Sequence, residues 1–373
     1  MKVRYGQLSY TCFDAVDAAG TAGGWQVKET NGNITADEAR LLVGGVHTTL
    51  NPAGPVPRYP TLQQLQTLPR RLAYRRINAN TAVYWHTAPA GRDSTGRPGN
   101  IFAHIVLDRD AARPDTGRRP IQLWGSPGWL TPYGDHAVAG ATLPGEAPPA
   151  GRVITADRAV QFCCDTVTWR LGTLCGLLDA VAAGLGGGPA VVLGTETADI
   201  AAQWIGAVSF LMSPGTAGQL NFSTFDRAAE LACTPPVGQH LVAVPRSDLG
   251  GVPPGVVVID AADTMSVGAL HGQPHRTAGG QNIEVTEWSA MTQVVLSDPE
   301  SAALLLADID EISSRVVDID LPPSLPMAMA VADRRRWADG AAEARSVLIA
   351  RTRGADIGCP GEPSGDRQTH WSR

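Results

Sequence analysis

Two histidines in neighbouring strand-like runs are the side chains best suited to chemistry. His86 lies in a run of Val, Tyr and Trp, and His104 lies in the next run, of Ile, Phe and Val. Because side chains alternate faces along a strand, a suitable register would place both imidazoles on one face of a sheet. With Asp108, Asp93 or Tyr84 nearby, such a pair could act as general acid and base. The alternative is a pair of sheet histidines with satisfied hydrogen bonds.

The polar segment between the two histidine runs could carry binding groups. It covers residues 91–99, contains Arg97 and is followed by Asn100. Loops of this kind on a hairpin often present binding residues on a rigid scaffold. Trp85 could add to an aromatic binding surface next to Tyr84, although tryptophans of a small sheet commonly belong to its core.

Acidic residues follow two apolar runs in the second half of the chain. Glu196 comes after the run 189–193, and Asp260 ends the run 255–260. Carboxylates at the carboxyl ends of parallel strands stand at the usual ligand edge of a sheet and could hold a metal ion. Acidic residues also cap helices and leave strands where no metal binds, and no metal motif accompanies these two. We therefore expect no metal, with Glu196 and Asp260 as the candidates if one is bound.

Several catalytic motifs are missing from the sequence. A phosphate-binding Walker loop needs a lysine after a glycine-rich turn, but Lys2 and Lys28 are the only lysines and neither follows such a turn. The glycines of 184–188 follow a helical run, where a dinucleotide-binding loop would follow a strand. There is no GxSxG elbow or HExxH helix, and the six cysteines lack CxxC spacing. These observations exclude a P-loop NTPase, identify no reaction and suggest no cofactor.

The elements that would position the histidines read as an antiparallel meander. Residues 71–77, 82–87 and 101–107 are rich in β-branched and aromatic residues, and Asn, Gly and Pro separate them. A further strand or edge segment is predicted at 121–124. Thr35 and Glu38 have the spacing of a capping box, which predicts a helix start there. The first part of the chain is thus predicted to be an α+β domain with a mainly antiparallel sheet.

The second part alternates strand-like and helical runs, which favours an α/β domain with a largely parallel sheet. Apolar residues at helical spacing predict one long helix over about 160–181, and a proline at position 299 predicts the start of another. We expect the following division: an N-terminal domain over 1–138, a Pro/Gly linker over 139–153, a middle α/β domain over 154–352 and a disordered tail over 353–373. Strands are expected at 189–193, 220–225, 240–244 and 255–260, and helices at 299–315 and 333–351.

Composition limits the classes of partner. The 373 residues suit about two domains, and 43% hydrophobic with 18% charged residues is ordinary for a globular protein. The net charge of -6 argues against a nucleic-acid or anionic-membrane partner, which would need a basic face. The N-terminus does not read as a signal peptide, and no apolar run is long enough to cross a bilayer. We therefore expect a cytoplasmic protein.

Two groups of short motifs follow one another along the chain. The first group is YGQLSY at 5–10, GWQVK at 24–28, RLAYR at 71–75, YWHT at 84–87 and GRPGNIFAH at 96–104; the second is PAVVL at 189–193, AQWI at 202–205 and LNFSTF at 220–225. The first group resembles the type-2 N-terminal domain of the actinobacterial GTPase-associated protein 1 family, and the second is similar to the middle domain of that family.

The resemblance implies a component of a bacterial NTP-dependent conflict or signalling system that acts beside a partner GTPase. It implies no established reaction for any residue. The favoured hypothesis is an interaction or regulatory protein that binds a GTPase or another NTPase. The alternative is an effector enzyme, a hydrolase or transferase, that uses His86 and His104; a third possibility is a scaffold whose binding does not depend on nucleotide.

Overall fold

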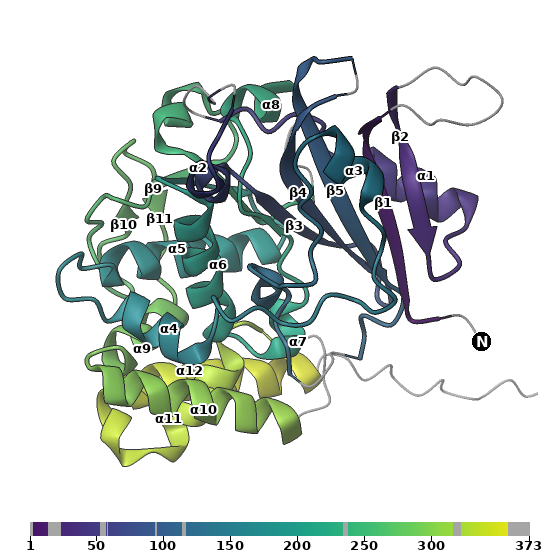
Figure 1. The fold of residues 1–373 in the computed structure, drawn as a ribbon. Coiled ribbons are helices and arrows are strands. Elements are labelled where there is room, and N and C mark those ends of the chain that lie inside the picture. Colours follow the sequence, from purple (N-terminus) through teal and green to yellow (C-terminus); the bar gives the residue numbers. More distant parts are fainter. Residues whose placement is uncertain are drawn as a thin grey trace, which may run out of the picture.

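A single mixed sheet organises the computed structural model, which describes residues 3–13, 24–52, 57, 59–93, 95–113, 117–233, 238–315 and 322–356. Within these residues nine strands follow the order β2-β1-β5-β4-β3-β7-β8-β6-β9 (Figure 1). The strands are β1 (Tyr5–Phe13), β2 (Gly24–Asn31), β3 (Arg71–Arg76), β4 (Ala82–Arg92), β5 (Pro98–Asp108), β6 (Val191–Thr195), β7 (Phe222–Ser223), β8 (Leu241–Pro245) and β9 (Val257–Asp260).

The predicted meander is confirmed. β3, β4 and β5 pair antiparallel, and β1 joins β5 and β2 in the same manner. β4 and β5 are longer than predicted and pair as far as Arg92 with Pro98, so only a short turn remains of the expected loop. Asp93 closes that turn, since its carboxylate accepts the backbone N–H groups of Thr95 and Arg97 at 3.0 and 2.8 Å.

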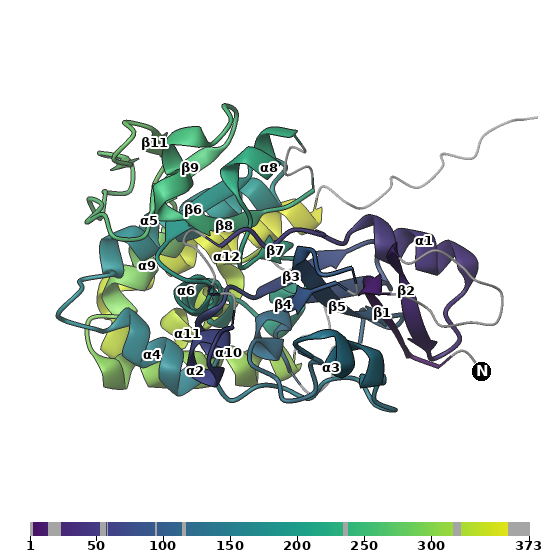
Figure 2. The same cartoon turned by 45° about the horizontal axis from the view of Figure 1, so that its top comes forward.

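Helices cover both faces of the antiparallel strands. On one side lies α1 (Ala36–Gly44), which begins with the predicted capping box of Thr35 and Glu38. On the other side lies α3 (Asp135–Gly140), as Figure 2 shows. The short α2 (Leu62–Thr67) leads into β3.

The later strands supply the predicted parallel part of the sheet. β6 pairs parallel with β8 and β9, and β7 pairs parallel with β8. β7 also pairs antiparallel with β3, through Ala73 with Ser223 and Tyr74 with Phe222. The sheet therefore continues across the predicted linker, and the division into domains at 139–153 stays a prediction.

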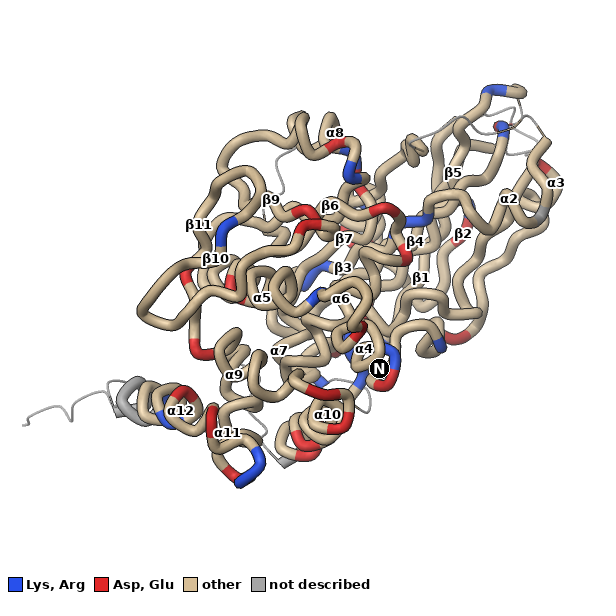
Figure 3. The backbone as a smooth tube through the Cα atoms, turned by 90° about the vertical axis from the view of Figure 1, so that its left-hand side faces the viewer, with Lys and Arg blue, Asp and Glu red and all other residues tan. Residues whose placement is uncertain are grey.

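The helices α5 and α6 pack on one side of the parallel strands. On the same side, α10, α11 and α12 form a third layer outside them (Figure 1). Figure 3 shows acidic residues along α10 in this layer and charges of both signs on α12. The helices of this half are α4 (Ala156–Cys163), α5 (Leu171–Leu185), α6 (Ala198–Phe210), α7 (Pro214–Ala217), α8 (Ala228–Cys233), α9 (Glu287–Val295), α10 (Pro299–Arg315), α11 (Leu325–Asp333) and α12 (Ala341–Asp356).

Three element predictions were wrong. The segment predicted as a strand at 121–124 forms the 3-10 helix η1 (Pro120–Leu123), because a proline at its first turn fixes φ and removes a strand donor. The long helix predicted over 160–181 is two helices, α4 and α5, because Asp165 organises a turn between them by accepting the N–H of Val167. The helix α11 was missed, and the predicted last helix begins at Ala341 after the 3-10 helix η3 (Arg335–Gly340).

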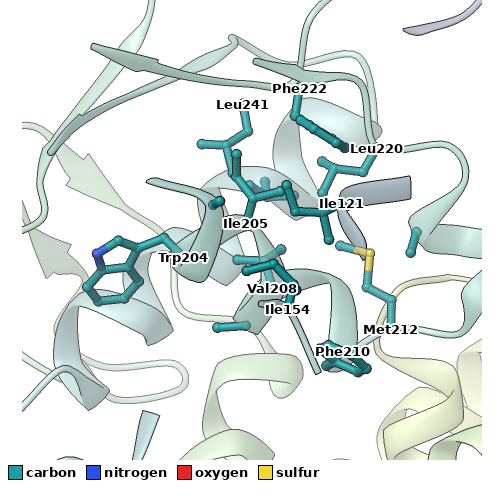
Figure 4. Packing of buried hydrophobic residues seen from close by; sticks show 14 of the residues in the cluster. Ile121, Ile154, Trp204, Ile205, Val208, Phe210, Met212, Leu220, Phe222 and Leu241 are labelled. Carbon is teal, nitrogen blue, oxygen red and sulfur yellow. The ribbon is translucent and has the colours of Figure 1, made fainter. Parts of the chain in front are cut away.

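Apolar residues from both halves of the chain share one core. Figure 4 shows Ile121 of η1 and Ile154 packed against the buried face of α6. Beside them, the buried guanidinium of Arg119 donates to the carbonyl oxygens of Ser209 and Met212 at 2.7 and 2.9 Å, and to the carboxylate of Asp310 in α10 at 2.7 Å. One arginine therefore joins the N-terminal part, the end of α6 and the outer helical layer.

The outer edge of β9 is covered by a side chain. Gln281 accepts the N–H of Val258 at 2.8 Å and donates to the carbonyl of Val256 at 2.9 Å, as a neighbouring strand would. Gln281 lies between the short strands β10 (His275–Arg276) and β11 (Asn282–Ile283).

The last helix marks the end of the described chain. α12 ends at Asp356, so most of the predicted disordered tail over 353–373 lies outside the described residues and stays a prediction. Among the described residues, no helix combines the length and the apolar character needed to cross a membrane.

Candidate functional site

The register of the meander brings the two candidate histidines together. His86 of β4 and His104 of β5 are direct cross-strand partners, so their side chains lie on the same face. Trp129 packs between them: its ring stacks on His86 at 4.9 Å and meets His104 edge-on at 5.1 Å. Both histidines are buried, with 3% and 0% of their surface exposed.

Both ring nitrogens of His104 have a partner. Nδ1 accepts the backbone N–H of Leu130 at 3.2 Å, so Nε2 carries the hydrogen and donates to Oε1 of Gln7 at 2.8 Å. The amide nitrogen of Gln7 donates in turn to the carbonyl oxygens of Pro144 and Glu146, which fixes the orientation of the amide. Burial lowers the pKa of His104 to about 4, so the ring is neutral at pH 7. These contacts match the structural alternative for this histidine.

His86 differs from its partner. Its Nδ1 is buried and has no hydrogen-bond partner among the described residues. Burial first, then the proximity of His104 and Arg70, hold the pKa of His86 well below its ordinary value. A neutral imidazole with an unpartnered nitrogen can donate or accept one more hydrogen bond. His86 can therefore still form a hydrogen bond, whereas both nitrogens of His104 already have partners.

A cavity of about 990 Å³ lies beside His86. One wall comes from the antiparallel part and includes Arg70, Trp124 and Trp129. The opposite wall comes from the start of α6 and from the carboxyl ends of β6 and β8. The cavity therefore lies where the two halves of the sheet meet, at the edge where α/β sheets commonly bind ligands.

The acidic partners considered for the histidine pair have other contacts. Asp108 lies four residues along β5 from His104, about 13 Å at the usual rise per strand residue, and pairs with Arg4 at 3.0 Å. The carboxylate of Asp93 is engaged by the turn that it closes. The structure thus brings His86 and His104 together but not Asp108.

The predicted binding residues lie in different environments. Asn100 is buried and bridges to β1, where its side chain accepts the N–H of Cys12 and donates to the carbonyl of the same residue. Asn100 also lines a second cavity, of about 530 Å³, beside the β4–β5 turn. Arg97 is exposed on that turn. Tyr84 and Trp85 are core residues, and the indole N–H of Trp85 donates to the carbonyl of Leu42 in α1 at 2.8 Å.

The metal candidates Glu196 and Asp260 lie at neighbouring strand ends, with an arginine between them. Arg246 holds Asp260 in a bidentate pair at 2.7 and 2.9 Å and approaches Glu196 at 3.4 Å. Although burial raises the pKa of Asp260, the hydrogen bonds from Arg246 lower it below its ordinary value. The chain itself therefore supplies the positive charge between these carboxylates.

A second polar cluster, which was not predicted from the sequence, is formed by His47, Asp226 and Glu230. Their ligand atoms lie within 4.8 Å of one another, and such a set suits a zinc ion. The buried Arg71 donates to Asp226 at 2.9 Å, however, and this guanidinium opposes a second cation in the same place. The spacing of Asp226 and Glu230 by four residues was the only local signal, because His47 is distant in the chain.

Comparison with known proteins identifies the domains around this cavity. Residues 4–148 match GTPase-associated protein 1, N-terminal domain type 2, and residues 167–262 match its middle domain. The chain belongs to the GTPase-associated protein 1 family, as its motifs predicted. Residues 306–360 match the TPR-like domain of SaeB.

Two curated relatives share most of this sequence. Both are called putative ESX-1 scaffolding and assembly protein SaeB, from Mycolicibacterium smegmatis strains ATCC 700084 and MKD8. They are 57% and 56% identical to this chain over 354 residues, which is 94% of the chain. The chain spans 42% of the length of each relative.

Proposed function

We propose that this chain is a cytoplasmic adaptor that binds protein partners during the assembly of a larger complex. The observation that carries the proposal is the 57% identity, over 94% of the chain, to a relative named for scaffolding and assembly. Residues 306–360 also match a TPR-like domain, and TPR repeats stack helices into binding surfaces.

An exposed apolar turn between α4 and α5 supports this role. Val167 and Trp169 have 89% and 57% of their surface exposed. Tryptophan is among the residues enriched at the energetic centres of protein interfaces. A tryptophan and a valine presented together on one turn are therefore suited to fill a pocket on a partner protein.

The turn is held in one shape before any partner binds. The carboxylate of Asp165 accepts from the N–H of Val167 at 3.0 Å, from the hydroxyl of Thr168 at 2.8 Å and from Arg170 at 3.2 Å. Trp169 adopts a φ of 46°, in the left-handed region that bulky residues rarely occupy. A preordered turn loses little conformational entropy when it binds, which favours affinity.

A GTPase is the partner that we propose. The family name associates these domains with a GTPase, and the sequence lacks the lysine that a phosphate loop of its own would need. An adaptor of this kind would sense the nucleotide state through the partner. An effector hydrolase or transferase using His86 and His104 is less consistent with the contacts, because both nitrogens of His104 are engaged.

The experiment compares partner capture by the tagged full chain and two variants. The test variant combines Val167→Ser with Trp169→Ala, and the control is Leu41→Ser, which removes an exposed leucine from α1. Each protein is incubated with cytosol from a host that carries the genes of the complex, with either GDP or a non-hydrolysable GTP analogue. Captured proteins are measured by quantitative mass spectrometry, and the captured GTPase is then purified and titrated directly.

We expect the wild type and Leu41→Ser to capture the same GTPase, preferentially in one nucleotide state. The double variant should bind it at least about tenfold more weakly, since a buried tryptophan anchor commonly contributes about 2 kcal/mol or more. Equal binding by the double variant would rule out this turn as the docking site. Failure of the purified chain to bind any component of the complex would reject the adaptor proposal itself.

A further inference from the structure

The cavity beside His86 has the position and size of a small-molecule site. Its volume of about 990 Å³ lies at the upper end of the usual range for ligand pockets, about 300–1,000 Å³. Its walls come from both matched GTPase-associated domains, because Arg70 and His86 lie within 4–148 and the start of α6 lies within 167–262.

Arg70 gives one wall of the cavity a positive charge without a compensating partner. The residue is half-buried, and no ion pair or hydrogen bond within the described part of the chain engages its guanidinium. The first residues of α6, from Thr197 to Asp199, line the opposite wall. The carboxylate of Asp199 in the first turn of α6 offsets the partial positive charge of this helix end, so Arg70 is the group that favours an anion.

Two acidic residues also line the cavity. Glu196 faces Arg246 at 3.4 Å, and Asp199 accepts the indole N–H of Trp124 at 2.8 Å. The charge of Glu196 therefore weighs less against an incoming anion, whereas the neutral indole leaves the charge of Asp199 in place. Arg70 is the cation in this cavity that an anionic ligand would pair with.

His86 and the aromatic residues indicate what the rest of the ligand is like. The imidazole of His86 lines the cavity and makes no hydrogen bond within the described residues, so it can bond a ligand there. Trp124, Trp129 and Phe225 also line the cavity. Aromatic walls of this kind favour a flat ring with a polar edge.

We propose that this cavity binds a small phosphorylated aromatic metabolite of mononucleotide size. Arg70 would hold the phosphate, and the imidazole of His86 would bond a polar edge of the ring system. This site is separate from the exposed turn of the adaptor proposal, so each can fail without the other.

Calorimetric titration of the full chain tests the proposal. The probes are guanosine 5′-monophosphate and adenosine 5′-monophosphate, together with three partial ligands: guanosine, ribose 5-phosphate and inorganic phosphate. The variants are Arg70→Gln, which removes the charge, and His86→Phe, which keeps a ring against Trp129 but removes both ring nitrogens. Arg158→Gln serves as the control, because Arg158 is an exposed arginine that does not line the cavity.

We expect at least one mononucleotide to bind with a Kd below about 1 mM and more tightly than any partial ligand. Arg70→Gln should raise that Kd about tenfold or more and leave the Kd of guanosine within about threefold, because a charge-assisted hydrogen bond to phosphate is lost. His86→Phe should raise the Kd of the mononucleotide several-fold, and Arg158→Gln should not change it.

Three results would overturn the proposal. The first is no heat of binding for either mononucleotide at millimolar concentration. The second is binding that is unchanged in Arg70→Gln, and the third is inorganic phosphate binding as tightly as the nucleotides. Thermal unfolding without ligand shows whether each variant is folded, and Arg70→Gln carries the test if His86→Phe is not, since Arg70 has no hydrogen bond to lose in the described structure.

Discussion

The imidazole of His104 is held neutral by its surroundings. Leu130 donates to one nitrogen, Gln7 accepts from the other, and the ring is fully buried. Protonation would place a second donor against the N–H of Leu130 and a charge in an apolar site. The histidine therefore stabilises the fold only while it remains uncharged.

This constraint predicts acid sensitivity in a defined pH window. The unfolded chain binds a proton at His104 near pH 6.5, but the folded chain binds it only near pH 4. The unfolded state therefore holds more protons between these values, and the free energy of unfolding falls as the pH drops from 6.5 to 4. His104→Asn should reduce this fall by about 3 kcal/mol, because it removes the group whose folded and unfolded pKa values differ. Urea denaturation at a series of pH values measures it.

The stability of His104→Asn relative to the wild type gives a second test of this prediction. At about pH 7.5 His104→Asn should be less stable than the wild type, because it loses the bond to Gln7. The two stability curves should converge as the pH decreases to about 4. Parallel curves over this range would show that His104 does not titrate as its burial requires.

At the scale of elements, α1 is positioned by one close contact at its end. Gly45 caps the helix, and a methyl group added there would lie 2.5 Å from ring atoms of Trp85. The same indole donates to the carbonyl of Leu42, so the tryptophan cannot move away without losing a buried hydrogen bond. Glycine at position 45 therefore lets α1 sit directly on β4.

Gly45→Ala should destabilise the protein by about 1–3 kcal/mol, the usual cost of overpacking. Gly44→Ala is the matched control, because no atom lies within 4 Å of the added methyl group and alanine is the better helix former. We expect Gly44→Ala to be neutral or stabilising by up to about 1 kcal/mol. Equal loss of stability in both variants, measured by urea denaturation, would contradict the contact with Trp85.

Elements with local signals were predicted from sequence, and those defined by distant contacts were not. The capping box of Thr35 and Glu38 and the meander of β3 to β5 depend on residues close in the chain. β7 has two residues and exists because β3 and β8 flank it. The break at Asp165 was missed because helical spacing of apolar residues continues across it.

The same distinction applies to the candidate site. The pairing of His86 with His104 could be foreseen because adjacent strands carry them. The cavity could not, because Arg70 and Glu196 line it from segments that are far apart in the sequence and that only the tertiary fold brings together. Hydrogen-bond partners from loops, such as Leu130 on His104, have no sequence pattern at all.

At the scale of the whole molecule, Arg119 is the residue that connects the most distant parts. Its side chain is 1% exposed and bonds Ser209, Met212 and Asp310 at once. Burial lowers the pKa of Arg119, while the hydrogen bond with Asp310 raises it. The guanidinium has no close substitute, because a lysine offers a point charge where three acceptors need a planar group.

Arg119→Met should destabilise the protein by about 3 kcal/mol or more, since it leaves two buried carbonyl oxygens and one carboxylate without a donor. Arg118→Met is the neighbouring control, with one long hydrogen bond of 3.5 Å to lose, and we expect a change within about 0.5 kcal/mol. The midpoint of chemical denaturation measures both. Comparable midpoints for the two variants would show that Arg119 does not join these parts.

The glutamine on the outer edge of β9 affects how copies of this chain behave at high concentration. An open strand edge is a template on which further copies of a chain can polymerise, and a protein gathered at high local concentration is especially exposed to that risk. Gln281 occupies the donor of Val258 and the acceptor of Val256, so this flank of the sheet cannot recruit another strand there. Copies of the chain at high concentration are therefore kept from joining to each other through this edge.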